Sequence, residues 1–542
     1  MTPYPHARTE RSLLFRGVSL VDGTGTEARP ADVLLAGGRV ARIEAAGTIP
    51  RGDAARTVDS DGLVLAPGFI DAHSHADCAP LLDGIDVSKI SQGVTTEVVG
   101  NCGFSLAPCP PERRTEFARM CGRIFPPLSY DWPTVADLFE RTDAGGYVTN
   151  TLPLVGHSVV RTAVLGTGDR APDAGELELM RREVSGALAA GAGGLSSGLI
   201  YPPGMYGDAD ELTALAGVLE PQHTYTTHLR GEGTRLIESL TEALEVARRA
   251  GCRLQVSHLK AAGRGAWGSV VPAMKLMDSA YEQGIRVHHD AYPYEANSTL
   301  LAGCLPPWFH DGGHEAAMRR LHDPEALARA EYDIEHDDGT WDNWVAGSGW
   351  ASILIAEAAD HRDEGRTIDR IARARSRTPF QTLVELLIAS ELRSWMCVFA
   401  MSPEDVDAVM LHPRACVGSD GAPPGRDGKP HPRLYGTFTR VLARYVRETG
   451  GMSLPEAVAK MTSLPAAAFG LPDRGTLAVG AAADAVLFDP RQVADQATFV
   501  DPTRLSTGIE TVVVNGTVTF ERGRPTGVRA GRRLSPQAHR TD

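Results

Sequence analysis

Strand-like and helix-like segments alternate along the middle of this 542-residue chain, and this alternation constrains the fold more than any other feature. Short apolar runs predict strands, and the amphipathic stretches between them predict helices. Alternation over about 400 residues is typical of an α/β protein with a (β/α)8 TIM-like barrel. The expected strands cover residues 94–99, 152–155, 194–197, 225–228, 254–258, 287–292 and 416–420. The expected helices cover residues 174–190, 234–250, 270–283, 367–389 and 453–467.

Short strand signals dominate the two ends of the chain. Residues 12–66 contain several such runs, with Gly37-Gly38 between two of them, and residues 484–524 contain Asn515-Gly516 between β-branched residues. Both glycine pairs are hairpin signals. Neither end has enough strands to be stable alone. We therefore expect both chain ends to form one small β-sandwich.

This organisation predicts domain boundaries. Residues 1–66 and 473–530 form the two parts of the β-sandwich, residues 67–472 form the barrel, and residues 531–542 form a tail. Residues 308–362, rich in Trp, His and acidic residues, interrupt the alternation. Because a long insertion in a regular fold is more often functional than idle, we expect a lid over the barrel mouth. A surface excursion or an oligomer contact is the alternative.

Composition narrows the classes of partner. A formal net charge of −14 argues against general binding to nucleic acid or to an anionic membrane. Residues 1–16 are polar, and no run of about 18 apolar residues predicts a membrane span. The eight cysteines are scattered without CxxC pairs and are expected to be reduced thiols. These features predict a cytoplasmic enzyme.

A His-x-His pair follows the apolar run that ends at Ile70. Because residues two apart on a strand face the same way, His73 and His75 can direct two imidazoles at one point. Two imidazoles with further ligands suit zinc or a similar divalent ion. The pair alone is weak evidence, since 17 histidines give roughly 0.5 such pairs per chain by chance. Its position at a strand end strengthens the prediction.

Three further metal-ligand candidates also stand at predicted strand ends. Cys102 lies in Gly-Asn-Cys-Gly, where the glycines permit a tight backbone and a nearby metal would keep the thiol deprotonated. His228 and His258 end two expected strands and are 30 residues apart, about one β/α unit. An inert buried cysteine and two core histidines are the alternatives, but the shared location favours ligands.

One acidic and two basic residues complete the candidate site. Asp420 stands between an expected strand and a glycine, where a carboxylate can transfer protons beside a metal-activated water. A turn or cap role is the alternative. Lys260, two residues after His258, and Arg433 are candidates to bind an anionic substrate group. Solvent exposure is the default for both cations.

Several motifs together resemble one family. From about residue 18 to residue 523, the chain resembles the N-acyl-D-amino-acid deacylases (D-aminoacylases) of the amidohydrolase superfamily. The matching motifs include Gly68-Phe-Ile-Asp-Ala-His-Ser-His75, Gly100-Asn-Cys-Gly103, Thr227-His-Leu-Arg230, Ser257-His-Leu-Lys260, Asp290-Ala-Tyr-Pro-Tyr294, Gly418-Ser-Asp-Gly421 and His431-Pro-Arg433. The His-x-His motif is general to the superfamily, whereas Gly-Asn-Cys-Gly and His-Pro-Arg are specific to this branch. Arg230-Gly-Glu232 departs from the Arg-Asp/Asn-Glu of many relatives.

The resemblance implies a zinc enzyme with defined residue roles. One tight zinc site would use Cys102, His228 and His258, and a second, weaker site would use His73, His75 and Asp420 with Cys102 bridging. Asp420 would act as general base and then as general acid. Lys260, Tyr292, Ser298 and Arg433 would bind the substrate carboxylate, with Tyr294 as a rival for the tyrosine role.

The implied reaction is hydrolysis of N-acyl-D-amino acids to a carboxylate and a free D-amino acid. Hydrolysis of a cyclic amide (hydantoin or dihydropyrimidine) or of a D-dipeptide is the alternative within the enzyme class. A non-catalytic scaffold of the same fold is the alternative from another class. The expected partner is a small-molecule substrate, and a homo-oligomer is compatible with the sequence, which specifies neither the side chain nor the acyl group.

Overall fold

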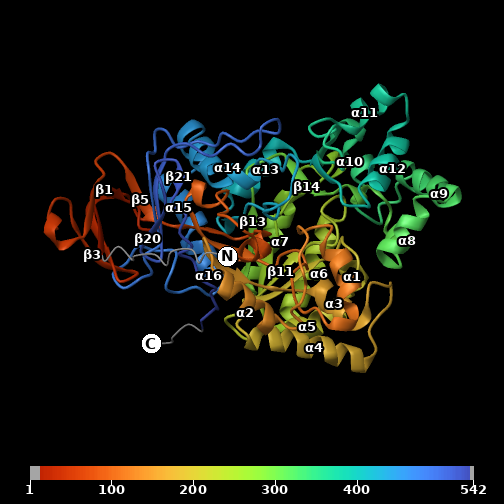
Figure 1. Cartoon of the computed structure of the whole chain (residues 1–542), viewed down its shortest axis with the longest axis horizontal. Helices are drawn as coiled ribbons and strands as arrows, with labels where there is room; N and C mark the ends of the chain where they lie inside the picture. The colour runs from red at the N-terminus through yellow and green to blue at the C-terminus, as the bar shows by residue number, and fades with distance from the viewer. Residues whose placement is uncertain (1–11, 538–542) are drawn as a thin grey trace.

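The computed structural model describes residues 12–537. Three regions follow one another across the molecule in Figure 1: strands from both chain ends, a central region of parallel strands and helices, and a projecting unit within residues 296–399. Residues 1–11 of the first predicted β segment and residues 538–542 of the predicted tail lie outside the described residues.

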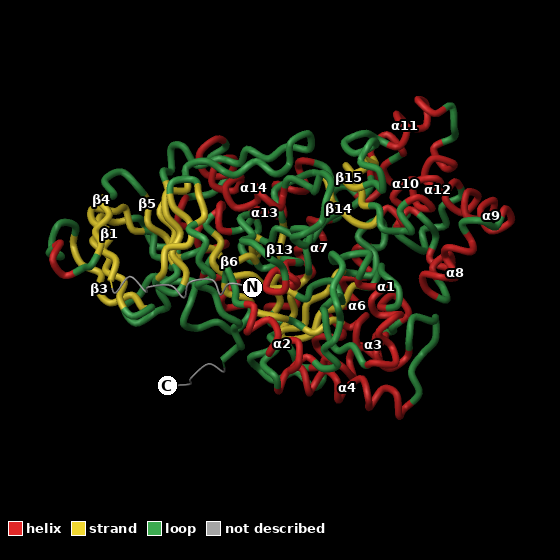
Figure 2. The backbone as a smooth tube through the Cα atoms, in the orientation of Figure 1, coloured by secondary structure: helices red, strands yellow, loops and turns green. Residues whose placement is uncertain are grey.

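The two chain ends contribute to one nine-stranded sheet, which is seen as the yellow strands on the left of Figure 2. β5 pairs antiparallel with β18, so the ends join in the middle of the sheet. The hairpins expected at Gly37-Gly38 and Asn515-Gly516 connect β2 to β3 and β19 to β20, with φ positive at all four residues. The strands are β1 (Ser12–Leu20), β2 (Arg29–Ala36), β3 (Arg39–Ala45), β4 (Arg56–Asp59), β5 (Val64–Pro67), β18 (Ala485–Phe488), β19 (Ile509–Val514), β20 (Thr517–Glu521) and β21 (Arg524–Pro525).

The central strands all pair in parallel. They form two sheets, β6-β7-β8 and β9-β10-β11-β12-β13-β17. β8 and β9 are separated only by Leu154, and at the other edge the Ala72 N–H donates to the Val417 carbonyl at 3.2 Å. The strands are β6 (Phe69–Asp71), β7 (Val94–Val99), β8 (Asn150–Pro153), β9 (Val155–Gly156), β10 (Gly194–Gly198), β11 (Thr224–His228), β12 (Arg253–Val256), β13 (Val287–Ala291) and β17 (Ala415–Val417).

Helices separate most of these parallel strands, so the predicted α/β class is confirmed. α4 begins with a capping box between Asp173 and Glu176, and α6 ends at Gly251, which has the left-handed backbone common at helix ends. The helices of this region are α1 (Arg114–Cys121), α2 (Val135–Gly145), α3 (His157–Leu165), α4 (Ala174–Ala189), α5 (Ala209–Ala216), α6 (Leu236–Ala250), α7 (Val270–Glu282), α13 (Pro403–Leu411), α14 (Arg433–Arg440), α15 (Leu454–Met461) and α16 (Ser463–Ala468). A π-helical segment, Val441–Glu448, continues α14.

The insertion between β13 and β17 has a sheet of its own. β14 (Ala296–Leu300) and β15 (Ile353–Glu357) both pair antiparallel with β16 (Trp395–Phe399). The unit therefore extends beyond residues 308–362 on both sides, and the helices expected over 367–389 belong to it. Its helices are α8 (Gly313–Arg320), α9 (Pro324–Glu335), α10 (Trp344–Ser348), α11 (Ile368–Arg375) and α12 (Pro379–Ala389).

Two further observations concern the described residues as a whole. All eight cysteines lie within residues 12–537, are buried and have free thiols, as expected. Among these residues, no helix has both the length and the apolar character needed to cross a bilayer.

Candidate functional site

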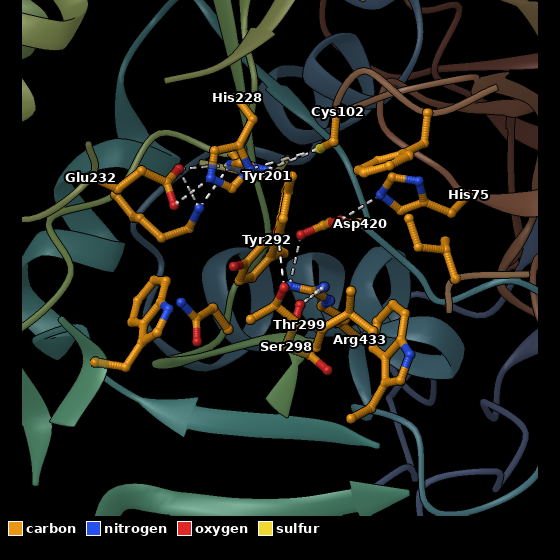
Figure 3. A pocket seen from close by; sticks show the side chains of 18 residues that line it. His75, Cys102, Tyr201, His228, Glu232, Tyr292, Ser298, Thr299, Asp420 and Arg433 are labelled. Carbon is orange, nitrogen blue, oxygen red and sulfur yellow. Dashed lines mark hydrogen bonds and ion pairs between the residues drawn. The ribbon is translucent and has the colours of Figure 1, made fainter. Parts of the chain in front are cut away.

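Cys102 lies at the centre of a buried cluster of three imidazoles, of which Figure 3 labels His228. Its Sγ is 3.3 Å from His73 Nε2, 3.8 Å from His228 Nδ1 and 3.6 Å from His258 Nε2. All four side chains are buried. The structure therefore brings together residues from four separate strand ends, as the sequence predicted.

Asp420 extends this cluster on a second side. Its Oδ1 lies 3.1 Å from His75 Nε2 and 3.6 Å from His73 Nε2, while its Oδ2 forms an ion pair with Arg433 Nη1 at 2.9 Å. All six expected ligands thus meet at one place. They form overlapping groups whose donor atoms lie within 4.8 Å of one another: His73, His75 and Cys102; Cys102, His228 and His258; and His73, His258 and Asp420.

The backbone places these side chains at or just beyond the strand ends. His228 is the last residue of β11, whereas Cys102, His258 and Asp420 follow their strands with φ of 54°, 34° and 46°. Left-handed backbone is strained for residues other than glycine and is concentrated at functional sites. Space is also restricted here, since a Cβ on Gly103 would lie 2.9 Å from the Gly198 nitrogen. The close approach explains the glycine that follows Cys102.

Electrostatics favour the ionised form of Cys102. Burial raises the pKa of this thiol, but His73, His228 and His258 outweigh burial and hold the pKa well below its usual range. Burial likewise raises the pKa of Asp420, whereas Arg433, with His258 and His73, lowers it well below the usual range. A buried thiolate and a carboxylate among imidazoles form a donor set suited to a divalent metal.

A narrow cavity opens at the cluster. Lys260, Tyr292, Ser298 and Arg433, the residues expected to bind the substrate, all line it. Its lining comprises His75, Cys102, Phe104, Ile124, Tyr201, His228, Glu232, His258, Lys260, Tyr292, Asn297, Ser298, Thr299, Leu300, Trp344, Trp395, Asp420 and Arg433. His73 lies beneath this lining and is fully buried.

The structure distinguishes the two candidate tyrosines, because only one of them lines the cavity. Tyr292 lines the cavity beneath the Arg433 guanidinium, 4.5 Å from ring to cation, and its buried hydroxyl has no hydrogen-bond partner within residues 12–537. Tyr294 does not line the cavity and stacks beside Arg440. The Ser298 hydroxyl already donates to the Met396 carbonyl at 2.9 Å. Tyr292 therefore has a free polar group for a ligand, and Ser298 is partly engaged.

Glu232 is a site residue for which the sequence analysis gave no role. Its carboxylate lies 3.3 Å from His228 Nε2, 3.0 Å from His258 Nδ1 and 2.7 Å from Lys260 Nζ. Burial raises its pKa, but His228, Lys260 and His258 lower it well below the usual range. One carboxylate thus orients the outer nitrogens of two imidazoles whose other nitrogens face Cys102. Its place in the Arg230-Gly-Glu232 segment, four residues after His228, was the sequence signal.

Asp290 performs a similar task for His73. Its Oδ1 lies 3.2 Å from His73 Nδ1 and accepts the His258 backbone N–H at 2.8 Å. Gln255 donates to the other carboxylate oxygen at 2.9 Å. Asp290 was part of a matching motif, but its function was not predicted.

A buried ion pair braces the strands that carry the cluster. Lys89 Nζ lies 2.6 Å from Asp71 Oδ2 and also contacts the Ser419 hydroxyl. The Ser419 backbone N–H donates to Asp71 Oδ1 at 2.7 Å. Asp71 and Ser419 flank His73 and Asp420, so this pair fixes two strand ends against each other. No sequence pattern connected Lys89 to them.

A family model now identifies the chain. The model described as "Amidohydrolase family" matches residues 56–520. The chain belongs to the amidohydrolase family. This finding agrees with the resemblance seen in the motifs and with the parallel α/β architecture.

Known amidohydrolases show where in the family the chain lies. It is 38% identical over 530 residues to N-acyl-D-glutamate deacylase of Alcaligenes xylosoxydans xylosoxydans, covering 97% of each chain. A zinc-bound N-acyl-D-glutamate deacylase of Bordetella bronchiseptica, in complex with a phosphonate mimic of the tetrahedral intermediate, is 36% identical with a TM-score of 0.81, covering 96% of this chain and 99% of that one. A D-aminoacylase with a binuclear metal centre, described as showing one-metal activation and second-metal attenuation, is 33% identical with a TM-score of 0.80 and the same coverage. The chain thus belongs among the N-acyl-D-amino-acid deacylases of this family.

Proposed function

We propose that this chain is a zinc-dependent N-acyl-D-amino-acid deacylase that releases a carboxylate and a free D-amino acid. The observation that carries the proposal is the convergence of Cys102, His228, His258 and Asp420 at the floor of one cavity. Near full-length similarity to named deacylases supports it.

The residues present fit zinc. A thiolate and two imidazole nitrogens are typical zinc donors, and in this protein they lie together, buried, with Glu232 on the outer nitrogens of both imidazoles. Cys102, His228 and His258 would hold one tight zinc. His73, His75 and Asp420, with Cys102 bridging, would hold a second, weaker one. When bound, zinc supplies Lewis-acid polarisation of the amide carbonyl and lowers the pKa of water.

Asp420 would transfer the protons of the reaction. It lies at the cavity floor with one oxygen toward His73 and His75 and the other toward Arg433. Asp420 takes a proton from the water that attacks the carbonyl carbon. It then gives this proton to the nitrogen as the C–N bond breaks, so that the amine departs neutral. The acyl fragment keeps the oxygen and the second proton of the water as a carboxylic acid, and transfer of that proton to the released amine gives the carboxylate.

Lys260, Tyr292 and Arg433 would anchor the carboxylate of the substrate, with Ser298 as a further contact. The Lys260 ammonium has three donors, one of which Glu232 accepts at 2.7 Å, and it also lies 2.7 Å from His258 Nδ1. The Tyr292 hydroxyl is unpaired within the described range 12–537 and lies next to Arg433. Anchoring the carboxylate and the acyl carbonyl leaves the side chain two possible directions, and only the one that suits the D-antipode need be open.

We also propose a specific architecture for the α/β fold. The two parallel sheets form one closed (β/α)8 barrel, supported by the adjacency of β8 and β9 and by the Ala72–Val417 hydrogen bond. Residues 1–66 and 473–530 form a β-sandwich beside the barrel domain 67–472, supported by their shared sheet and its separate apolar core. The insertion serves as a lid, supported by the cavity-lining residues Leu300, Trp344 and Trp395.

A substrate panel with zinc-loaded enzyme tests the proposed function. N-acetyl-D-amino acids should release free amine, whereas their L-antipodes, hydantoins, dihydropyrimidines and D-dipeptides should release little. Preferential turnover of a hydantoin or a D-dipeptide would favour those alternatives, and near-zero zinc with no turnover would favour a non-catalytic scaffold. The Cys102→Ser protein should lose zinc and activity, whereas Cys252→Ser, at a buried cysteine outside the cavity lining, should retain both.

A cytoplasmic location and assembly into a homo-oligomer stay predictions. The net charge of −14 supports the expectation that neither nucleic acid nor an anionic membrane is a partner. Light scattering of the purified chain would measure its oligomeric state.

A further inference from the structure

The segment that carries Glu232 has no regular secondary structure to hold it. Residues 229–233 form a loop between β11 and α6, and a glycine flanks Glu232 on each side. Because glycine restrains the backbone least, this loop does not by itself fix where the Glu232 carboxylate points. That carboxylate nevertheless contacts two imidazoles and one ammonium group. Its position therefore depends on groups outside the loop.

Asp342 of the insertion holds this loop by two hydrogen bonds. Asp342 lies between α9 and α10. Its Oδ2 accepts the Glu232 backbone N–H at 2.8 Å, and its Oδ1 accepts the Gly233 backbone N–H at 3.1 Å. A Cβ on Gly233 would lie 3.0 Å from Asp342 Oδ1, so the glycine leaves room for the carboxylate. One side chain thus binds two successive amides of the loop from 110 and 109 residues away.

Neighbouring contacts join the insertion to the same part of the barrel region. Arg235 Nη1 donates to the Thr340 carbonyl at 2.8 Å. α10 approaches the loop after β12, where a Cβ on Gly263 would lie 3.1 Å from the Gly347 Cα. The loops contacted by the insertion follow β11 and β12, the two strands whose ends bring imidazoles to Cys102. The insertion therefore packs directly behind part of the metal-ligand cluster.

We propose that Asp342 is a positioning residue for the metal site: it fixes the peptide that carries Glu232, and through Glu232 it orients His228 and His258. The proposal rests on the proposed function, because it assigns a role at the same zinc site. A carboxylate suits this task, since its two oxygens accept two N–H groups at once and bind them more strongly than a neutral acceptor would. The inserted unit thereby contributes to metal binding, although all six ligand candidates lie outside it.

The alternative role for Asp342 is to anchor the insertion alone. Both roles predict some loss of stability when the carboxylate is removed, so stability does not distinguish them. They differ in whether the effect on zinc depends on Glu232. If Asp342 acts through Glu232, the two substitutions are not additive, because residues that act in one chain of contacts are coupled.

Competition with a chelator measures zinc affinity and tests this dependence. We expect Asp342→Ala to weaken zinc binding roughly three- to tenfold, less than the loss of a group that contacts the imidazoles directly. In the Glu232→Gln background, the same substitution should change the affinity by less than about twofold. Asp360→Ala is the matched control, because Asp360 is an exposed carboxylate of the insertion that accepts the Arg362 backbone N–H at 3.2 Å. Equal losses in both backgrounds, or no loss in the parent background, would overturn the proposal.

Hydrogen–deuterium exchange of the metal-free protein gives a second readout that needs neither zinc nor turnover. The peptide covering residues 229–235 should contain amides that exchange at least about tenfold faster in Asp342→Ala than in the parent. Asp342→Asn keeps one acceptor oxygen and should give a smaller increase, and it replaces the alanine variant if that variant does not fold. If the parent chain binds no zinc, the proposed function fails. If the parent binds zinc, but both exchange and zinc affinity are unchanged in the Asp342 variants, only the role of Asp342 fails.

Discussion

The floor and the wall of the active-site cavity differ in the origin of their residues and in how they are held. The floor, from Cys102 to Asp420, consists of ionisable side chains at parallel strand ends, each braced by a buried partner such as Glu232, Asp290 or Asp71. The wall consists of Leu300, Trp344 and Trp395, which come from the insertion, and the indole N–H of Trp395 donates to the Arg123 carbonyl at 3.1 Å. The difference teaches that residues of the parallel strands can supply the chemistry of the proposed reaction while residues of the inserted unit supply part of the surface that a substrate would contact.

The largest effect should follow from removing the proton carrier of the floor. Asp420→Asn is expected to lower kcat about 10²- to 10⁴-fold, because the variant cannot accept a proton from water. Zinc held by Cys102, His228 and His258 should remain. Steady-state kinetics and metal analysis of the same preparation measure both quantities. Normal turnover with zinc retained would refute the role of Asp420.

The brace beneath the floor should matter mainly for stability. Lys89→Met leaves Asp71 as a buried, unpaired carboxylate and is expected to lower the free energy of unfolding by about 3–5 kcal/mol. Adding Asp71→Asn should restore part of this loss, since the uncompensated charge is removed. Urea unfolding measures the change, with exposed Lys275→Met as the control. Equal stability of the single and double variants would contradict a charge-based brace.

Glu232 should affect metal affinity more than fold. Glu232→Gln weakens the acceptor that orients His228 and His258, so we expect zinc affinity to fall about 10- to 100-fold. Competition with a chelator measures the affinity, and far-UV circular dichroism checks the fold. Glu242→Gln, which loses only a contact to Arg230, is the matched control. Unchanged affinity in the Glu232 variant would show that the imidazoles need no such orientation.

A substitution in the wall should affect the metal-ligand residues of the floor least. Leu300→Ala is expected to change kcat/KM for N-acetyl-D-phenylalanine by about tenfold. Zinc content and turnover of N-acetyl-D-alanine should stay near those of the parent. Loss of zinc in this variant would show that the floor and the wall are coupled, and the comparison would fail.

The sequence predicted the floor well because strand ends are local features. The run 94–99 coincides with β7, and His228 ends β11 as expected. His258 lies two residues beyond β12, with a left-handed backbone that periodicity cannot reveal. The hairpins at Gly37-Gly38 and Asn515-Gly516 also followed from local residue preferences.

The braces and the insertion sheet were less predictable for a physical reason. Lys89 contacts both the Asp71 carboxylate and the Ser419 hydroxyl, and Ser419 is 330 residues away in the sequence. No local pattern predicts which buried groups will meet over such a separation. The helices over 367–389 were recognised by their periodicity, but periodicity does not say which sheet a helix covers. They pack in the insertion, so the predicted lid 308–362 was narrower than the observed unit.

X-ray absorption at the zinc edge tests the central claim most directly. For the protein loaded with one equivalent of zinc, we predict one sulfur and several nitrogen or oxygen ligands, the same spectrum in Cys252→Ser, and no retained zinc in Cys102→Ser. A spectrum without sulfur in the parent protein would contradict the claim that the thiolate at the cavity floor holds the metal.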